Sequence, residues 1–331
     1  MEYRLKSVPE DFIVQENLAL PLAESGEHAY VEVRKRGVGT IAAARYLAEL
    51  LAIKPALVVH AGLKDEEAVT TQWFSVPSEA ALRAKTTFTP GFRHGVPGGT
   101  VEFVLRGFGE APLSTGLLPG NTFRIVARDV SLASDRVSAG DRLDFAFLNL
   151  YGPQRFGPPG GLSNAPEIGR AIVEGRWGEA LQAYAAQHPD NRTRLEGLTG
   201  TPQGILRQAA GEKLLTLFIS ALEASRWNAE LEEKYQRLLA DAGRTAAGRS
   251  SAVRQMYATC PTLPYVRHYN GGTEAGRATM VQTCLCIHRI WREGPACSID
   301  LQFSLPSGAY ATVCLDQWFT ELGASGQEGA P

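Results

Sequence analysis

The segment Ala61-Gly62-Leu63-Lys64-Asp65-Glu66-Glu67-Ala68-Val69-Thr70-Thr71-Gln72 is the most informative stretch of this 331-residue chain. It comes after an apolar run at 57–59 and leads into a strand-like run at 72–76, so we expect Asp65 on a loop at a strand end. Gly and Asp are ordinary turn residues, and local physics alone favours a turn in which Asp65 caps the next element. The alternative is a chemical role, in which a cation such as Lys64 keeps Asp65 ionised as a nucleophile or base.

The residues around this segment alternate as β-strands do. At 29–35, Val31 and Val33 fall on one face, and further strand-like runs occur at 72–76, 101–106 and 122–128. Between the first two strands, Thr40 is a candidate N-cap for a helix. The apolar positions of that helix are Ile41, Ala44, Leu47, Leu50 and Leu51. Strands interrupted by only occasional helices favour an α+β fold with a mostly antiparallel sheet.

The pattern changes after residue 161. Residues 162–245 are rich in Ala, Leu, Glu and Arg at helical spacing, and strand-like alternation returns at 298–305 and continues at 309–314. We therefore predict one sheet domain interrupted by a helical insertion. The predicted parts are 1–160 for the first part of the sheet domain, 161–275 for the insertion and 276–331 for the last part of the sheet domain.

Charge and apolar content limit the class of protein. The 33 basic and 35 acidic residues nearly cancel, so a polyanionic partner must meet local patches, such as the six basic residues within 83–128. The beginning of the chain has no apolar signal-peptide core, and no apolar run reaches the 18 residues of a membrane helix. We expect a cytoplasmic globular protein with no membrane partner.

Common cofactor motifs are missing from the sequence. There is no phosphate-binding G-x-x-x-x-G-K-[ST] loop, no G-x-G-x-x-G, no G-x-S-x-G and no H-E-x-x-H, so we expect no nucleotide cofactor. One metal alternative exists, since Cys284, Cys286 and His288 share a face of a strand, with Cys297 further on. Buried structural cysteines are commoner than metal sites, and we predict no bound metal.

Five blocks of sequence together resemble a known family. They are Pro9–Glu16 with Lys6 upstream, the Ala61–Gln72 segment, Gly120–Ile125, Asn149–Gly157 (NLYGPQRFG) and Leu305–Thr312 (LPSGAYAT). In this order they are similar to the signatures of the TruD family of tRNA pseudouridine synthases, including its A-G-x-K-D-x-x-A-x-T-x-Q motif.

The resemblance implies a pseudouridine synthase fold, a mixed and mostly antiparallel sheet with flanking helices and a helical insertion domain. It also implies a reaction on tRNA, at position 13 if the family's target is kept. The N1–C1′ bond of a uridine is broken, the base rotates, and C5 is joined to C1′. This isomerisation needs no cofactor, energy source or metal.

The resemblance also assigns roles to individual residues. Asp65 is the catalytic carboxylate, and Lys6, with Lys64 as second candidate, is the cation that keeps it charged. The other residues expected to bind substrate are Phe12, Gln72, Asn121, Phe123 and Arg155. For Phe12 and Phe123 the alternative to contact with the target base is packing in the core, and Gln72 could anchor the catalytic loop.

The sequence departs from the family in three places, one of which is Ala224, where the S-x-x-F-N helix of the family usually has Ser. Leu150-Tyr151 stands where the family has Tyr-Phe, and the region between the fourth and fifth blocks is shorter than the usual insertion. The exact RNA target and the oligomeric state therefore stay open. A second hypothesis is a non-catalytic RNA-binding or RNA-folding module on the same fold.

Overall fold

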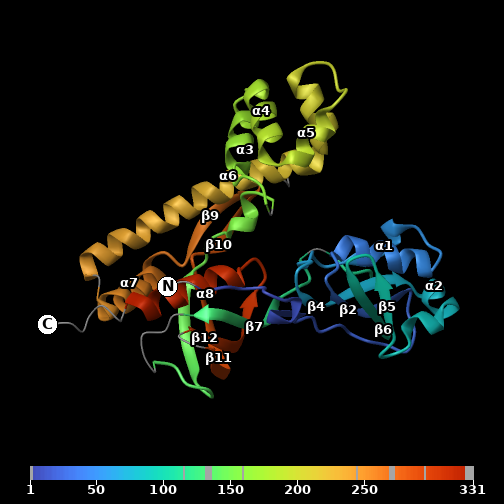
Figure 1. Ribbon diagram of the computed structural model, residues 1–331, viewed down its shortest axis with the longest axis horizontal. Coiled ribbons are helices and arrows are strands. Elements are labelled where there is room, and N and C mark those ends of the chain that lie inside the picture. The colour runs from blue at the N-terminus through green and yellow to red at the C-terminus, as the bar shows by residue number, and fades with distance from the viewer. Residues whose placement is uncertain are drawn as a thin grey trace. The chain divides into compact units, whose positions relative to one another are not determined.

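The computed structural model describes residues 3–114, 116–130, 136–158, 160–243, 245–267, 273–293 and 296–324 (Figure 1). Its contacts divide the chain into two compact units. The first comprises Met1–Phe145, Gln282–Gly308 and Phe319–Pro331, and the second comprises Ala146–Val281 and Ala309–Trp318. Two of the boundaries between these units fall after Phe145 and after Val281, so they do not test the domain limits predicted at 160 and 275. Those limits stay predictions.

One sheet dominates the described residues, in which it has ten strands. Its order is β5-β6-β2-β4-β1-β7-β12-β11-β8, with β3 paired to β4. The strands are β1 (Phe12–Glu16), β2 (His28–Arg36), β3 (Val59–His60), β4 (Val69–Pro77), β5 (Arg93–Val96), β6 (Gly99–Gly109), β7 (Gly120–Val130), β8 (Arg142–Leu148), β11 (Met280–Glu293) and β12 (Ala296–Pro306). Strand β1 runs parallel to β4 but antiparallel to β7, and β7 is antiparallel to β12. The predicted mixed and mostly antiparallel sheet is confirmed.

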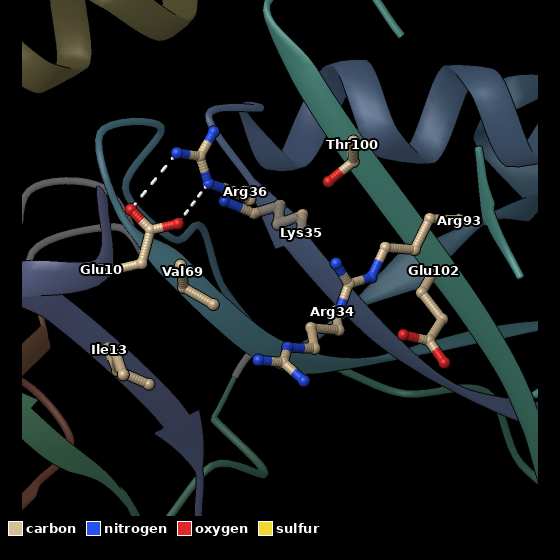
Figure 2. Close-up of a pocket in the computed structure, with 9 residues that line it drawn as sticks. All are labelled: Glu10, Ile13, Arg34, Lys35, Arg36, Val69, Arg93, Thr100 and Glu102. Carbon is tan, nitrogen blue, oxygen red and sulfur yellow. Dashed lines mark hydrogen bonds and ion pairs between the residues drawn. The ribbon is translucent and has the colours of Figure 1, made fainter. Parts of the chain in front are cut away.

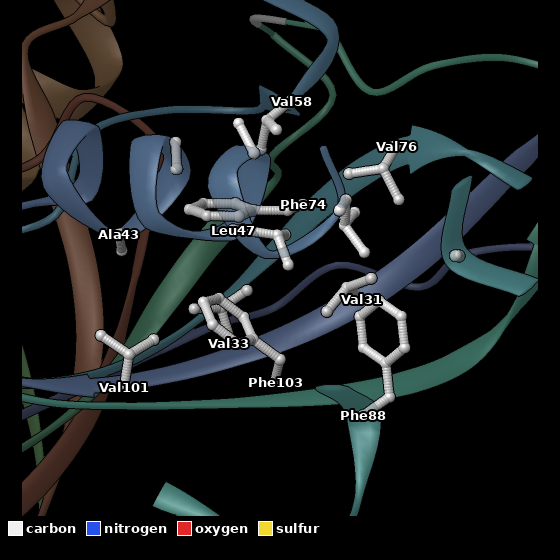
Figure 3. Packing of buried hydrophobic residues seen from close by; sticks show 14 of the residues in the cluster. Val31, Val33, Ala43, Leu47, Val58, Phe74, Val76, Phe88, Val101 and Phe103 are labelled. Carbon is white, nitrogen blue, oxygen red and sulfur yellow. The ribbon is translucent and has the colours of Figure 1, made fainter. Parts of the chain in front are cut away.

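Helix α1 (Thr40–Leu50) covers one face of β2, β4 and β6 (Figure 3). The apolar residues that alternate along β2 and β4 meet Leu47, which is fully buried, and each such large side chain contributes about 1.5–3 kcal/mol. The N-cap of α1 is Gly39, and no side chain caps the helix. The predicted cap role of Thr40 is wrong, because its hydroxyl is buried and bonded elsewhere.

Helices form most of the second unit. They are α3 (Ala165–Val173), α4 (Trp177–Gln187), α5 (Pro189–Leu195), α6 (Pro202–Ala242) and α7 (Ala246–Thr259), and after them comes the hairpin of β9 (Thr262–Arg267) and β10 (Thr273–Ala278). Gly169 lets α3 approach α6 closely, since a Cβ there would lie 2.1 Å from the Phe218 carbonyl oxygen. Helix α6 is interrupted at Gly211, whose φ is +75°.

The segment after the turn at 306–308 is helical, which corrects the strand expected at 309–314. Helix α8 (Ala311–Ala324) begins there. Its buried positions are Ala311, Cys314, Leu315, Trp318 and Phe319. This is the 3.6-residue period of a helix, and a six-residue window was too short to reveal it. No helix in the described part of the chain combines the length and the apolar character that a membrane crossing requires.

Candidate active site

Asp65 lies on the connection between β3 and β4, as the sequence predicted. The carboxylate oxygen Oδ2 lies 2.6 Å from Nζ of Lys6, and the Asp65 side chain is 36% exposed. Lys6 itself adopts a left-handed backbone with φ of +57°, which is costly for a residue with a Cβ. The backbone is therefore strained at the residue whose ammonium contacts Asp65.

Lys64, the neighbour of Asp65, has a different partner. Its Nζ lies 2.7 Å from Glu16 Oε1, and the side chains are 7% and 0% exposed. The other oxygen of Glu16 accepts a hydrogen bond from the backbone N–H of Trp73 at 2.8 Å. The buried pair ties the loop to β1, so Lys64 positions the loop while Lys6 contacts the carboxylate.

Gln72 and Thr40 hold the same loop through hydrogen bonds. The Thr40 hydroxyl donates to Gln72 Oε1 at 2.9 Å and accepts from the backbone N–H of Lys64 at 2.8 Å. The Gln72 amide donates to the Gly62 carbonyl at 3.4 Å. Both side chains are buried, and their hydrogen bonds anchor the loop at Gly62 and Lys64.

Sequence reasoning missed Lys35, which is 1% exposed. Its Nζ donates to the backbone carbonyls of Asp65 at 2.7 Å and Lys64 at 3.3 Å. Burial lowers the pKa of Lys35 from 10.5 to about 8, an effect that the Asp65 carboxylate opposes and the Lys64 ammonium reinforces. A signal was available, since Lys35 continues the phase of Val31 and Val33 on the buried face of β2.

Three aromatic rings form a cluster, one of which contacts the Lys6 ammonium. Phe12 packs edge-on against Phe123 with centroids 6.2 Å apart, and Phe123 stacks on Phe303 at 5.6 Å. The Lys6 ammonium lies 4.6 Å from the centre of the Phe12 ring, a cation–π contact. Phe123 is 8% exposed. Its packing in this cluster is thus observed, while its contact with a base stays a prediction.

Asn121 lies opposite Glu16 in the register of β7 and β1. Directly opposed residues of an antiparallel pair share a face, so the Asn121 and Glu16 side chains lie on the same face of the sheet. Phe123 is two residues from Asn121 on β7, so its side chain lies on that face too. Its Oδ1 is buried and has no hydrogen-bond partner in the described part of the chain. A buried acceptor without a donor is costly in a folded protein, and it is an available acceptor for a ligand's N–H.

Arg155 belongs to the second unit, in a 3₁₀ turn at Pro153–Arg155. Its guanidinium lies 5.8 Å from the centre of the Tyr151 ring. The other seven residues predicted for the site all belong to the first unit. The role of Arg155 toward the substrate stays a prediction.

The cysteines of the metal alternative lie on β11 and β12. Cys284 Sγ and Cys286 Sγ are 4.0 Å apart, while His288 is hydrogen-bonded to Gln302. Burial raises the pKa of the Cys297 thiol, which donates to the Val130 carbonyl. Within the described residues, no group of three His, Cys, Asp or Glu side chains is arranged to hold a metal ion.

A cationic pocket of about 200 Å³ lies on the other face of the sheet (Figure 2). The side chains of Ile13, Arg34 and Arg36 alternate with those of Phe12 and Lys35, which face the Asp65 side. Arg36 is paired with Glu10. Arg34 and Arg93 flank Glu102 in the strand register, and neither has an ion-pair partner within the described ranges.

Most of the basic cluster predicted at 83–128 is neutralised by ion pairs. Arg83, Arg106, Arg124 and Arg128 pair with Glu79, Glu32, Asp300 and Asp11, respectively. Arg124 and Arg128 each make two hydrogen bonds to their carboxylate, and these bonds join neighbouring elements of the first unit. Lys85 and Arg93 are the two members of the cluster without an ion-pair partner in the described ranges.

Comparisons with known proteins agree with this picture. The family model "TruD: tRNA pseudouridine synthase D" matches residues 1–197. A protein of Legionella pneumophila (strain Corby) named tRNA pseudouridine synthase D is 30% identical over 94% of this chain and 93% of its own length. A protein of the same name from Methylococcus capsulatus (strain Bath) is 27% identical over 94% and 89%.

A solved structure shares the fold. The crystal structure of the putative tRNA pseudouridine synthase D from Methanosarcina mazei matches with a TM-score of 0.60 and 18% identity, over 96% of this chain and 93% of that one. The fold is thus that of a pseudouridine synthase. The sequence matches carry the assignment further, and the chain belongs to the tRNA pseudouridine synthase D (TruD) family.

Proposed function

We propose that this chain isomerises a uridine of tRNA, at position 13, to pseudouridine, with Asp65 as the catalytic carboxylate. Membership of the TruD family supports the reaction, and relatives named tRNA pseudouridine synthase D support tRNA as the substrate. The 2.6 Å contact between Lys6 and Asp65 is the observation that carries the assignment of the site. Either form of the mechanism uses the Asp65 carboxylate as the reacting group, and the Lys6 ammonium is the cation that contacts it.

The reaction balances without an outside reagent. The N1–C1′ bond breaks and its electron pair leaves with the base, which rotates so that C5 faces C1′. A C5–C1′ bond then forms, the C5 proton is lost, and N1 gains a proton. The Asp65 carboxylate acts either by attacking the nucleotide covalently or by promoting detachment of the base. No electron is gained or lost overall, and the proposal includes no cofactor.

The remaining residues bind and orient the uridine in this proposal. A target uridine has to leave its stack, which costs a few kcal/mol. Asn121 Oδ1 can accept the N3–H of uracil, since it is buried and without a partner in the described residues. Phe12, which contacts Lys6, and Phe123 are proposed to contact the base, and Arg155 is proposed to bind a phosphate. Lys64, Gln72 and Lys35 hold the loop that carries Asp65.

We further propose that the protein works in the cytoplasm, where its tRNA substrate is used, and that the predicted insertion at 161–275 contributes to RNA binding. Arg34 and Arg93 are proposed phosphate contacts, because they are exposed cations without an ion-pair partner in the described ranges. The alternative function is an RNA-binding module without activity. It would use the same phosphate contacts, but it would not require the ion pair of Lys6 and Asp65.

The test uses full-length protein and a tRNA transcript labelled with 5-tritiated uridine. Loss of the C5 hydrogen releases tritium to water, and sequencing of the product locates the modified uridine. We expect release by the wild type and none by Asp65→Asn, with tRNA affinity unchanged within a few-fold. Release by Asp65→Asn would reject the site, and binding without release by the wild type would favour the non-catalytic module.

A further inference from the structure

The helical part of the second unit contains a pocket of which the proposed function uses only Arg155. Its volume is about 430 Å³, within the range of small-molecule sites. It is lined by Arg155 and Pro158 from the segment after β8, by Gln187 at the end of α4, by Arg194 of α5, and by Leu214 and Phe218 of α6. All of these residues belong to the second unit.

Polar groups in the pocket wall lack partners. Gln187 is only 4% exposed, and its amide Nε2 has no hydrogen-bond partner in the described part of the chain. The Nε of Arg155 is likewise buried without a partner there. A buried N–H without an acceptor is costly, so each of these groups is a position where a ligand's acceptor would stabilise the protein.

The charge of the pocket is positive. Neither Arg155 nor Arg194 forms an ion pair with a described carboxylate. The one carboxylate in the wall is Asp190, which lies 3.5 Å from the imidazole of His188. Two guanidinium groups without an ion-pair partner in the described residues are suited to an anionic group such as a phosphate, whose oxygens a guanidinium can bind with two hydrogen bonds.

The rest of the wall is apolar. Leu214, Phe218 and Pro158 line the pocket with hydrophobic surface between the polar groups. A ligand that fits must therefore have a flat apolar face, a carbonyl at its edge for the Gln187 amide, and an anionic end for the arginines. These are the parts of a nucleotide: a base, its carbonyl edge and its phosphate.

We propose that this pocket binds a nucleotide, with the base against Leu214 and Phe218, its carbonyl on Gln187 Nε2, and the phosphate between Arg155 and Arg194. The nucleotide comes from one of two sources. It is a nucleotide of the bound tRNA other than the target uridine, an assignment that rests on the proposed function, or it is a free mononucleotide. The chemistry at the pocket is the same for both.

The experiment measures binding by full-length protein carrying Asp65→Asn, so that turnover does not interfere. The probes are a tRNA transcript, uridine 5′-monophosphate, adenosine 5′-monophosphate and inorganic phosphate. The test variant is Arg155→Gln with Arg194→Gln. The matched control is Arg192→Gln, because Arg192 lies on the same helix but donates to the Ala185 carbonyl and does not line the pocket. Melting temperatures check that both variants fold.

If tRNA supplies the nucleotide, the double variant binds tRNA about tenfold more weakly than the parent, and a mononucleotide competes with tRNA at the pocket. The log–log slope of affinity against salt also decreases by the equivalent of about one to two phosphate contacts. If the source is a free nucleotide, mononucleotide binding is lost and tRNA binding is unchanged. The control stays within twofold of the parent throughout.

Two results overturn the proposal. One is unchanged binding of tRNA and of both mononucleotides by a folded double variant. The other is inorganic phosphate that binds as tightly as the mononucleotides, which would make the pocket a simple anion site. Tritium release by the wild-type protein is measured separately. Failure of that reaction rejects the proposed function and leaves the mononucleotide result intact.

Discussion

Lys6 and Asp65 are 59 residues apart in sequence, and their side chains meet at 2.6 Å. The sequence neighbour Lys64 is instead paired with Glu16 inside the protein. Two lysines near one carboxylate thus have separate tasks: one contacts the proposed catalytic oxygen, and the other holds the loop. The Lys6 side chain is 17% exposed, so water screens its pair with Asp65 only partly.

Replacing Lys6 with Met should lower the rate of pseudouridine formation by on the order of 10- to 100-fold, because a charge next to the reacting group is lost. Lys6→Arg should retain more activity, since it keeps the charge. Tritium release under single-turnover conditions measures the rate. Lys54→Met is the control, because Lys54 is exposed and forms no ion pair with a described residue. Equal rates for Lys6→Met and the control would remove Lys6 from the site.

A substitution at Phe123 distinguishes two roles of this ring, stacking on a base and packing in the protein. Phe123→Leu keeps an apolar side chain, so the cost in folding free energy should be about 1.5 kcal/mol. Activity should still fall by on the order of tenfold, because base–aromatic stacking is worth about 1–3 kcal/mol. Phe103→Leu, at a fully buried position of the α1 core (Figure 3), should lower stability alone. Full activity of Phe123→Leu would leave this ring a packing role only.

Lys35 should make stability depend on pH in a defined direction. Its pKa is about 8 in the folded protein and near 10.5 when unfolded, so between these values the unfolded chain binds more protons. The unfolding free energy of the wild type, relative to Lys35→Met, should therefore rise by on the order of 1–3 kcal/mol from pH 7.5 to pH 10. Urea titrations at several pH values measure it.

The exposed Lys85→Met should show no such dependence on pH. A flat difference between wild type and Lys35→Met across this range would mean that Lys35 keeps its ordinary pKa. Lys35→Met should also lower activity, since the carbonyls of Lys64 and Asp65 lose their donor.

Arg34 and Arg93 should contribute to RNA binding through charge. Replacing both with Gln should weaken binding of all RNA sequences alike and flatten the log–log salt slope by about one to two units. Filter binding of tRNA between low and high salt measures the slope. Arg106→Gln is the control, because Arg106 is already paired with Glu32. A slope equal to that of the control would show that the pocket in Figure 2 does not face phosphates.

The sequence predicted those elements whose periodicity is continuous. The alternation at 29–35 and 122–128 correctly predicted β2 and β7, because one face of each strand is mostly buried and the other is more exposed. The segment at 309–314 was misassigned since only its continuation to Phe319 reveals the helical repeat. The order of strands could not be derived at all, because pairing such as that of β1 with β4 and β7 depends on contacts far apart in sequence.

For the site, motif resemblance selected the residues and placed Lys6 before Lys64 as the cation beside Asp65, and the fold shows this contact. It did not give the other partners, since only the fold shows that Lys64 reaches Glu16. The same holds for Arg124 and Arg128, whose carboxylate partners lie more than 100 residues away. Charge alone does not reveal which cations are left for RNA.

The position of β12 in the sheet has a consequence for synthesis. This strand joins β7 near the end of the chain, and its Phe303 completes the ring cluster that begins with Phe12. Until the ribosome has made residues 296–306, the edge of β7 has no partner from this strand, and non-local pairing of this kind is slow. The nascent chain therefore carries Asp65 and Lys6 long before the site is complete, and a ribosome-bound fragment that ends before β12 would not yet be an enzyme.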